Sequence, residues 1–294
     1  MRTRRHFLLL AAMLFASPAA AQDKIKVVAT FSILGDLVKN VGGDRVEVAT
    51  LVGSNGDAHV YSPTPGDAKT LATAKVVFVN GLGLEGWMTR LVRASATKAP
   101  SVVVSTGVKP RQMKDDHGHA NDPHAWQSIA NAKIYVANIR DGLIKADAAG
   151  KAVYESNAAA YLAKLDALDA EVRATIAKIP AARRRIITSH EALGYFGEAY
   201  GIEIVAPVGV ATDTEPSARD IAKIIAQVKK QNIPAVFMEN ISDQRLMQQI
   251  ARETGAKIGG TLFSDALSAP DGPASTYIDM IRHNIRTLSV ALQS

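Results

Sequence analysis

The stretch KAVYESNAAAYLAKLDALDAEVRATIAKI, from Lys151 to Ile179, separates this chain into two parts and thereby decides its fold. Neither Gly nor Pro interrupts it, and Pro180 follows directly, where a regular helix cannot continue. Apolar residues recur within it at steps of three or four, which predicts one long helix with a narrow buried stripe. That stripe consists of Tyr154, Ala158, Tyr161, Leu165, Leu168, Val172, Ile176 and Ile179.

The predicted helical region extends from about Ala148 to Ile179. About 30 residues at 1.5 Å each give a rod of roughly 45 Å, which is long enough to cross both flanking parts of the chain. A narrow apolar stripe also suits a coiled coil with a second chain. We favour an internal brace, because this single segment stands between two parts that each have their own alternation of strands and helices.

Short apolar runs alternate with amphipathic segments on both sides of this helix. The expected strands are 25–30, 46–52, 75–80 and 101–105 before it, and 185–189, 203–206, 235–239 and 257–262 after it. The expected helices lie at 31–42, 65–73, 87–94, 191–200, 216–230, 244–254 and 275–292, and a long helical region is expected to open after Asp122–Trp126. This alternation predicts an α/β fold of two similar lobes, each a mainly parallel four-stranded sheet with helices on both faces, joined by one long backbone helix.

Some residues repeat between the two parts. Leu34-Gly35 and Gly42 recur as Leu193-Gly194 and Gly201 at the same offsets, which indicates two lobes of like topology. We therefore expect an N-terminal lobe at residues 22–147, a connecting helix at 148–180 and a C-terminal lobe at 181–294.

The first 21 residues have the pattern of a removable signal peptide. Three arginines precede an apolar run at 7–16, and three alanines at 19–21 form a small-residue cleavage site. The apolar run is too short to span a membrane, and both the general secretory route and the twin-arginine route suit this leader. The chain has no cysteine, which removes the attachment point of an N-terminal lipid. We therefore expect a soluble periplasmic protein that is not lipid-anchored.

Composition excludes several other classes of function. Removal of the leader takes away three arginines and no acid, so the formal net charge falls from +6 to +3, which gives no argument for a nucleic acid partner. The absence of cysteine excludes disulfides and thiolate ligands. No GxxxxGK[ST], HExxH or GxSxG motif is present. The run Gly81–Gly86 spells GxGxxG, but it follows the third expected strand rather than the first, and we interpret it as a turn.

Four candidate metal ligands follow expected strands or the turn after them. They are His59, His124, His190 and Asp265, two in each part of the chain. Ligands of parallel α/β sheets bind beyond the carboxyl ends of the strands, so these side chains are expected to meet where the lobes face each other. Imidazole nitrogen with carboxylate oxygen suits zinc, or manganese less tightly. Four protein ligands leave no open position, which indicates a site that holds a metal rather than one that hydrolyses a substrate.

Each of the four also has a simpler interpretation. His59 suits a solvent-facing loop, His124 could pack on Trp126, His190 could cap the following helix, and Asp265 could be an N-cap. Their shared position after strands favours the metal site over four separate explanations.

Three further residues have two interpretations each. His117 and His119 lie in a short polar loop with two aspartates, and they either capture metal weakly or belong to an ordinary surface loop. Glu239 follows a strand and is either a fifth carboxylate near the site or, as we favour, an acceptor for loop backbone.

At these residues the sequence resembles the metal-binding proteins of zinc and manganese ABC importers (solute-binding protein family 9, TroA/ZnuA-like). The resemblance covers essentially the whole chain after the leader, and it is carried by Asp57–Pro65, Asp122–Trp126, Thr188–Phe196 and Phe263–Leu267. It implies that the protein is a monomeric binding protein and not an enzyme. It also implies that His59, His124, His190 and Asp265 hold a divalent ion, which is delivered to an ABC permease in the inner membrane.

The resemblance also bears on the identity of the metal. Manganese-type members usually have Glu where this chain has His190, so three histidines and one carboxylate are similar to the zinc type. The histidine-rich loop and the cysteine pair of zinc members are reduced or missing here. We favour Zn2+ and keep Mn2+ as the alternative. An exported zinc metallohydrolase and a surface adhesin are the competing classes of function.

Overall fold

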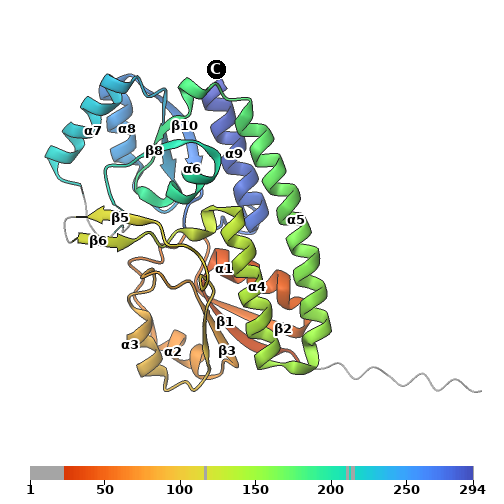
Figure 1. Cartoon of the computed structure of the whole chain (residues 1–294). Coiled ribbons are helices and arrows are strands. Elements are labelled where there is room, and N and C mark those ends of the chain that lie inside the picture. Colours follow the sequence, from red (N-terminus) through yellow and green to blue (C-terminus); the bar gives the residue numbers. More distant parts are fainter. Residues whose placement is uncertain (1–22, 116–117, 210–211, 213–215, 294) are drawn as a thin grey trace, which may run out of the picture.

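Two four-stranded parallel sheets form the centres of two lobes (Figure 1). The computed structural model describes residues 23–115, 118–209, 212 and 216–293, so the expected signal peptide at 1–21 lies outside the described residues. We use N-terminal lobe for the elements β1 to α4 and C-terminal lobe for β7 to α9.

The sheet of the N-terminal lobe has the strand order β2-β1-β3-β4, with every neighbouring pair parallel. Its strands are β1 (Ile25–Phe31), β2 (Val46–Val52), β3 (Val76–Val79) and β4 (Ser101–Val103). All four residues of β3 are buried, as expected for a strand covered on both faces.

The sheet of the C-terminal lobe has the order β10-β9-β7-β8, again parallel throughout. Its strands are β7 (Arg185–Ile187), β8 (Glu203–Val205), β9 (Ala235–Glu239) and β10 (Lys257–Leu262). The first sheet is read from β2 to β4 and the second from β8 to β10. In both, the second strand of the lobe comes first, followed by its first, third and fourth strands. The prediction of two similar lobes is therefore confirmed at the level of strand order.

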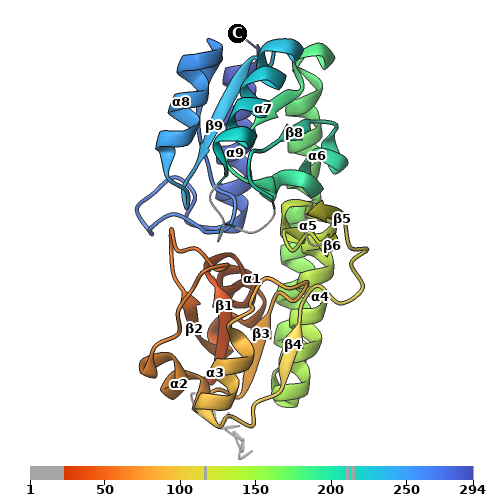
Figure 2. The same cartoon turned by 90° about the vertical axis from the view of Figure 1, so that its left-hand side faces the viewer.

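Helices lie around both sheets (Figure 2). In the N-terminal lobe they are α1 (Ser32–Gly42), α2 (Pro65–Ala72), α3 (Met88–Ser95) and α4 (Ile129–Ala146). In the C-terminal lobe they are α6 (Gly194–Tyr200), α7 (Ala218–Gln231), α8 (Gln244–Thr254) and α9 (Tyr277–Gln293). Short 3-10 helices occur at η1 (Gly43–Arg45), η2 (Ala125–Gln127), η3 (Ala148–Gly150), η4 (Ala181–Arg183) and η5 (Glu191–Leu193). Gly43 and Gly201 end α1 and α6 with φ of 56° and 75°, a conformation that favours glycine.

The helix α5 (Lys151–Ala177) runs alongside both lobes (Figure 1). Its 27 residues correspond to about 40 Å of helix. Every residue of the predicted stripe is buried, and α5 packs against α1 and α4 of one lobe and α9 of the other. The stripe therefore faces the interior of this chain, and α5 is the internal brace that its sequence predicted.

Two short segments, the polar stretch before Asp122 and the GxGxxG run, are expected from the sequence to lack strands and helices. The polar segment before Asp122, expected to be a loop, forms the antiparallel hairpin of β5 (Gln112–Asp115) and β6 (Gly118–Asn121). It carries no alternation of apolar residues from which strands could have been predicted. The GxGxxG run is a turn, as expected, with Gly81 and Gly83 at φ of 82° and 91°. Among the helices of the described residues, none has the length and apolar character needed to cross a membrane.

Candidate metal centre

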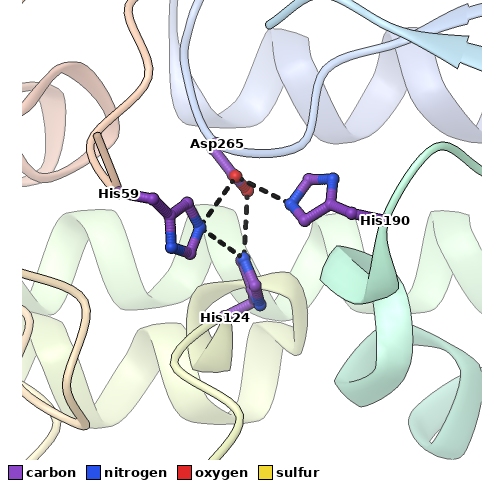
Figure 3. A group of neighbouring side chains, drawn as sticks. All are labelled: His59, His124, His190 and Asp265. Atoms are coloured by element: carbon purple, nitrogen blue, oxygen red, sulfur yellow. Dashed lines mark hydrogen bonds and ion pairs between the residues drawn. The ribbon is translucent and has the colours of Figure 1, made fainter. Parts of the chain in front are cut away.

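The four predicted ligands converge between the lobes (Figure 3). His59 lies in the loop between β2 and α2, and His124 directly precedes η2. His190 precedes η5, and Asp265 lies in a bend after β10. One ligand atom from each residue can be chosen so that all four atoms lie within 4.8 Å of one another. Within the described residues, these four side chains form a group whose spacing suits one metal ion.

Short distances link the four side chains, and Asp265 lies close to all three histidines. Nε2 of His59 lies 3.1 Å from Nε2 of His124, and Nε2 of His190 lies 3.0 Å from Oδ2 of Asp265. Oδ2 of Asp265 is also 3.3 Å from Nε2 of His59, and its Oδ1 is 3.5 Å from Nε2 of His124. Nitrogen and oxygen donors that face one another in this way surround a space for a cation.

The site is removed from solvent. The side chains of His124 and Asp265 are 0% exposed, that of His190 is 2% exposed, and that of His59 is 6% exposed. Oδ1 of Asp265 has no hydrogen-bond partner in the described residues. A buried carboxylate oxygen without a partner costs free energy, and a bound cation would remove that cost. The donors present therefore fit a divalent metal ion.

An aspartate two residues earlier fixes each histidine of the N-terminal lobe. Oδ1 of Asp57 accepts a hydrogen bond of 2.8 Å from the backbone N–H of His59, and Oδ1 of Asp122 accepts one of 3.0 Å from that of His124. These are Asx turns, which close locally. Oδ1 of Asp122 also lies 2.8 Å from Nδ1 of His124, so it holds the ring with Nε2 directed at the site.

A residue distant in the sequence supports His190. Oε1 of Glu239, at the end of β9, accepts hydrogen bonds from the backbone N–H groups of Ser189 and His190 at 2.7 and 3.0 Å. Its Oε2 lies 2.9 Å from Nδ1 of His190. Glu239 is thus the acceptor for loop backbone that we favoured. Its second oxygen faces the far side of the His190 ring and leaves Nε2 for the site.

The electrostatics of the cluster favour positive charge at its centre. Burial alone would raise the pKa of Asp265, but His124 and His190 hold this pKa well below its ordinary value. Burial lowers the pKa of His190, yet Glu239 and Asp265 bring it well above its ordinary value. Burial also lowers the pKa of His124, but Asp265 and Asp122 outweigh burial and raise it to about 9. Carboxylates thus create a potential that attracts cations to a dry site.

The geometry bears on the simpler interpretations of His124, His190 and Asp265. His124 does contact Trp126, with ring centroids 5.3 Å apart, and it faces the cluster at the same time. His190 makes no side-chain capping hydrogen bond, and a bend rather than a helix follows Asp265. His117 lies outside the described residues, and for His119 only the backbone, in β6, is described. The supports Asp57 and Asp122 were missed, although the repeated Asp-x-His pattern was a signal for them.

Comparisons with known proteins show similarity to metal-binding proteins of one family. The family model "Zinc-uptake complex component A periplasmic" (ZnuA) matches residues 27–291. The manganese-binding lipoprotein MntA of Halalkalibacterium halodurans is 35% identical over 289 residues, which cover 96% of this chain and 95% of MntA. The iron-binding protein YfeA of Yersinia pestis is 35% identical over 281 residues, 95% of this chain and 90% of YfeA. The solved structure of the periplasmic zinc binding protein TroA from Treponema pallidum has a TM-score of 0.87 at 31% identity, covering 92% of this chain and 100% of TroA.

The relatives correct one expectation. MntA is named a lipoprotein, as are PsaA of Streptococcus pneumoniae and MtsA of Streptococcus pyogenes. The prediction of a periplasmic protein that is not lipid-anchored is contradicted by these names and was wrong. The prediction rested on two points. The chain has no cysteine, and thus no thiol to which a lipid could be attached. The leader lies outside the described residues.

Proposed function

We propose, since the chain belongs to the ZnuA family of metal-uptake proteins, that it binds one divalent ion at His59, His124, His190 and Asp265 and delivers this ion to an ABC-type permease. Members of this family are solute-binding proteins of metal transport and not enzymes. All four proposed ligands come from one chain, so a single copy is sufficient for binding.

The observation that carries the proposal is the convergence of three imidazoles and one carboxylate from two lobes. Because each lobe supplies two ligands, the ion is bound only while the lobes are together. Separation of the lobes by a permease would divide the ligand set and release the ion. The continuous helix α5 packs on both lobes and limits that separation to a small tilt.

Zinc is the ion that we propose, with manganese as the alternative. Three imidazole nitrogens and one carboxylate favour zinc over manganese, because zinc binds nitrogen ligands more tightly. The relatives are named for manganese, iron and zinc, so the metal must be measured on this protein.

The test is calorimetric titration of the untagged, metal-stripped protein with Zn2+, followed by competition with Mn2+. We expect one zinc ion per chain and no displacement by equimolar manganese. His59→Ala should lose tight binding, because it removes one of four donors. His283→Ala is the matched control, since His283 on α9 contacts the carbonyl oxygen of Thr261 on β10 and lies outside the ligand set. Equal binding by wild type and His59→Ala would contradict the proposed site, and displacement by manganese would contradict the choice of zinc.

The division of the chain belongs to the same proposal. Residues 22–147 and 181–294 are proposed as the two lobes, 148–180 as their connection and 1–21 as a removable leader. Mass spectrometry of the protein recovered from cells tests the leader, because cleavage predicts a mature chain that begins at Gln22.

A further inference from the structure

Arg111 lies at the junction of the lobes, directly before β5, and contacts both of them. Its Nη1 donates to Oδ2 of Asp122 at 3.1 Å, and its Nε donates to Oε1 of Glu198 on α6 at 2.8 Å. The Asp122 side chain is 0% exposed, whereas Glu198 is 65% exposed. One guanidinium thus joins a buried acid of the N-terminal lobe to a surface acid of the C-terminal lobe.

The Asp122 carboxylate uses its two oxygens for different partners. Oδ2 accepts a hydrogen bond from Nη1 of Arg111, and Oδ1 faces the backbone N–H and Nδ1 of His124. A buried carboxylate with a fixed partner on each oxygen cannot rotate, so Arg111 restrains the orientation of the His124 ring through Asp122.

The opposite lobe is shaped to receive this guanidinium. A side chain at Gly194, the first residue of α6, would collide with Nη1 and Cζ of Arg111. The next residue, Tyr195, accepts a hydrogen bond from the backbone N–H of Arg111 and donates one to the carbonyl oxygen of Asp122, at 2.8 and 3.0 Å. Because α6 follows His190 and η5, these contacts connect the ligand loops of both lobes.

We propose that Arg111 is a positioning residue of the metal site, which orients His124 through Asp122 and ties that orientation to contact between the lobes through α6. The inference rests on the proposed function, since it requires His124 to be a ligand. When the lobes separate, Arg111 loses Glu198 and its seat at Gly194. The His124 ring is then held less firmly, so lobe separation weakens metal binding before the ligands themselves part.

The first test compares zinc affinity and dissociation rate, by chelator competition, in wild type and Arg111→Met. Loss of a supporting group of this kind costs roughly 10- to 100-fold in affinity, and we expect a loss in that range. Arg282→Met is the matched control, because Arg282 makes an equivalent 2.9 Å contact from α9 to Glu171 on α5, away from the ligands. Loss of an exposed pair of this type should change affinity less than about twofold.

A double-mutant cycle separates positioning from a general structural role. In a His124→Ala background, Arg111→Met should cause no further loss of affinity, because the ring on which it acts is gone. In a His59→Ala background it should keep its full effect. An equal loss in the two backgrounds would overturn the inference.

Two other variants test the contact with α6. Gly194→Ala displaces the guanidinium without removing its charge and should reproduce the faster zinc dissociation of Arg111→Met. Glu198→Gln leaves the Asp122 contact in place and should accelerate dissociation by only about two- to fivefold. Wild-type affinity in both Arg111→Met and Gly194→Ala would overturn the inference while leaving the proposed function intact. Absence of zinc binding by the wild-type protein would overturn both.

Discussion

In the N-terminal lobe each proposed ligand is held by an aspartate two residues before it, whereas in the C-terminal lobe the ligands depend on residues far away in the sequence. Glu239, 49 residues beyond His190, accepts from the His190 backbone. The carbonyl oxygen of Ser264, next to Asp265, accepts hydrogen bonds from Nε1 of Trp126 and Nε2 of Gln127 of the other lobe, at 3.0 and 2.6 Å.

This difference exists although the two sheets have the same strand order. It shows that a shared topology sets where the ligands lie and does not set how they are held. Local turns fix the backbone at His59 and His124, and Arg111 restrains the His124 ring through Asp122. His190 depends on Glu239 of its own lobe, and Asp265 follows a carbonyl group that accepts hydrogen bonds from the other lobe.

The largest expected effect tests the ligand that depends most on both lobes. Asp265→Asn keeps the shape of the side chain but removes the negative charge that faces three imidazoles. We expect zinc affinity to fall by more than the roughly 100-fold that loss of a supporting group costs. Calorimetry measures this, with the exposed Asp271→Asn in the same lobe as control. A loss below tenfold would mean that Asp265 is not a ligand.

A smaller effect compares the two kinds of support directly. Glu239→Gln removes the charge next to Nδ1 of His190, and we expect roughly a tenfold loss of zinc affinity. Asp57→Asn keeps an oxygen that can accept the part-buried hydrogen bond from the backbone of His59, so its loss of zinc affinity should be only about twofold. Chelator competition measures both variants side by side. The comparison between lobes would be refuted if Asp57→Asn were the more damaging change.

The smallest expected effect on zinc affinity belongs to Asp36 at the lobe junction, which acts on stability instead. Burial raises the pKa of Asp36 on α1 to about 6, although the backbone N–H of Tyr277 on α9 donates to its carboxylate at 2.9 Å. The folded protein therefore binds this proton more tightly than the unfolded chain does. The resulting stabilisation is present below about pH 4 and is lost as the pH rises through about 6, by an amount on the order of 3 kcal/mol.

Asp36→Asn should remove that part of the pH dependence and make the protein more stable than wild type at pH 7. Urea unfolding of the metal-free proteins between pH 4 and pH 8 measures the difference, and zinc affinity at pH 7 should remain unchanged. Parallel pH profiles for the two proteins would show that Asp36 ionises normally in the folded state.

The candidate site could be predicted only in part because its supports differ in range. Asp57 and Asp122 are sequence neighbours of the histidines they hold, so a repeated Asp-x-His pattern would have been enough to find them. Arg111 could not be found in this way, because its partners are Asp122 and Glu198, 11 and 87 residues away. No periodicity or turn motif links residues at such separations.

The sequence by itself determined most of the elements and their alternation, but not the hairpin of β5 and β6. The stripe of α5, the alternation of strands and helices, and the glycines that end α1 and α6 are local patterns, because each follows from helix periodicity, strand burial or backbone conformation. Only the tertiary structure decided that four ligand atoms meet within 4.8 Å, and which distant groups hold them. Those contacts depend on the packing of α5 against both lobes, since its burial fixes the distance between their ligand loops.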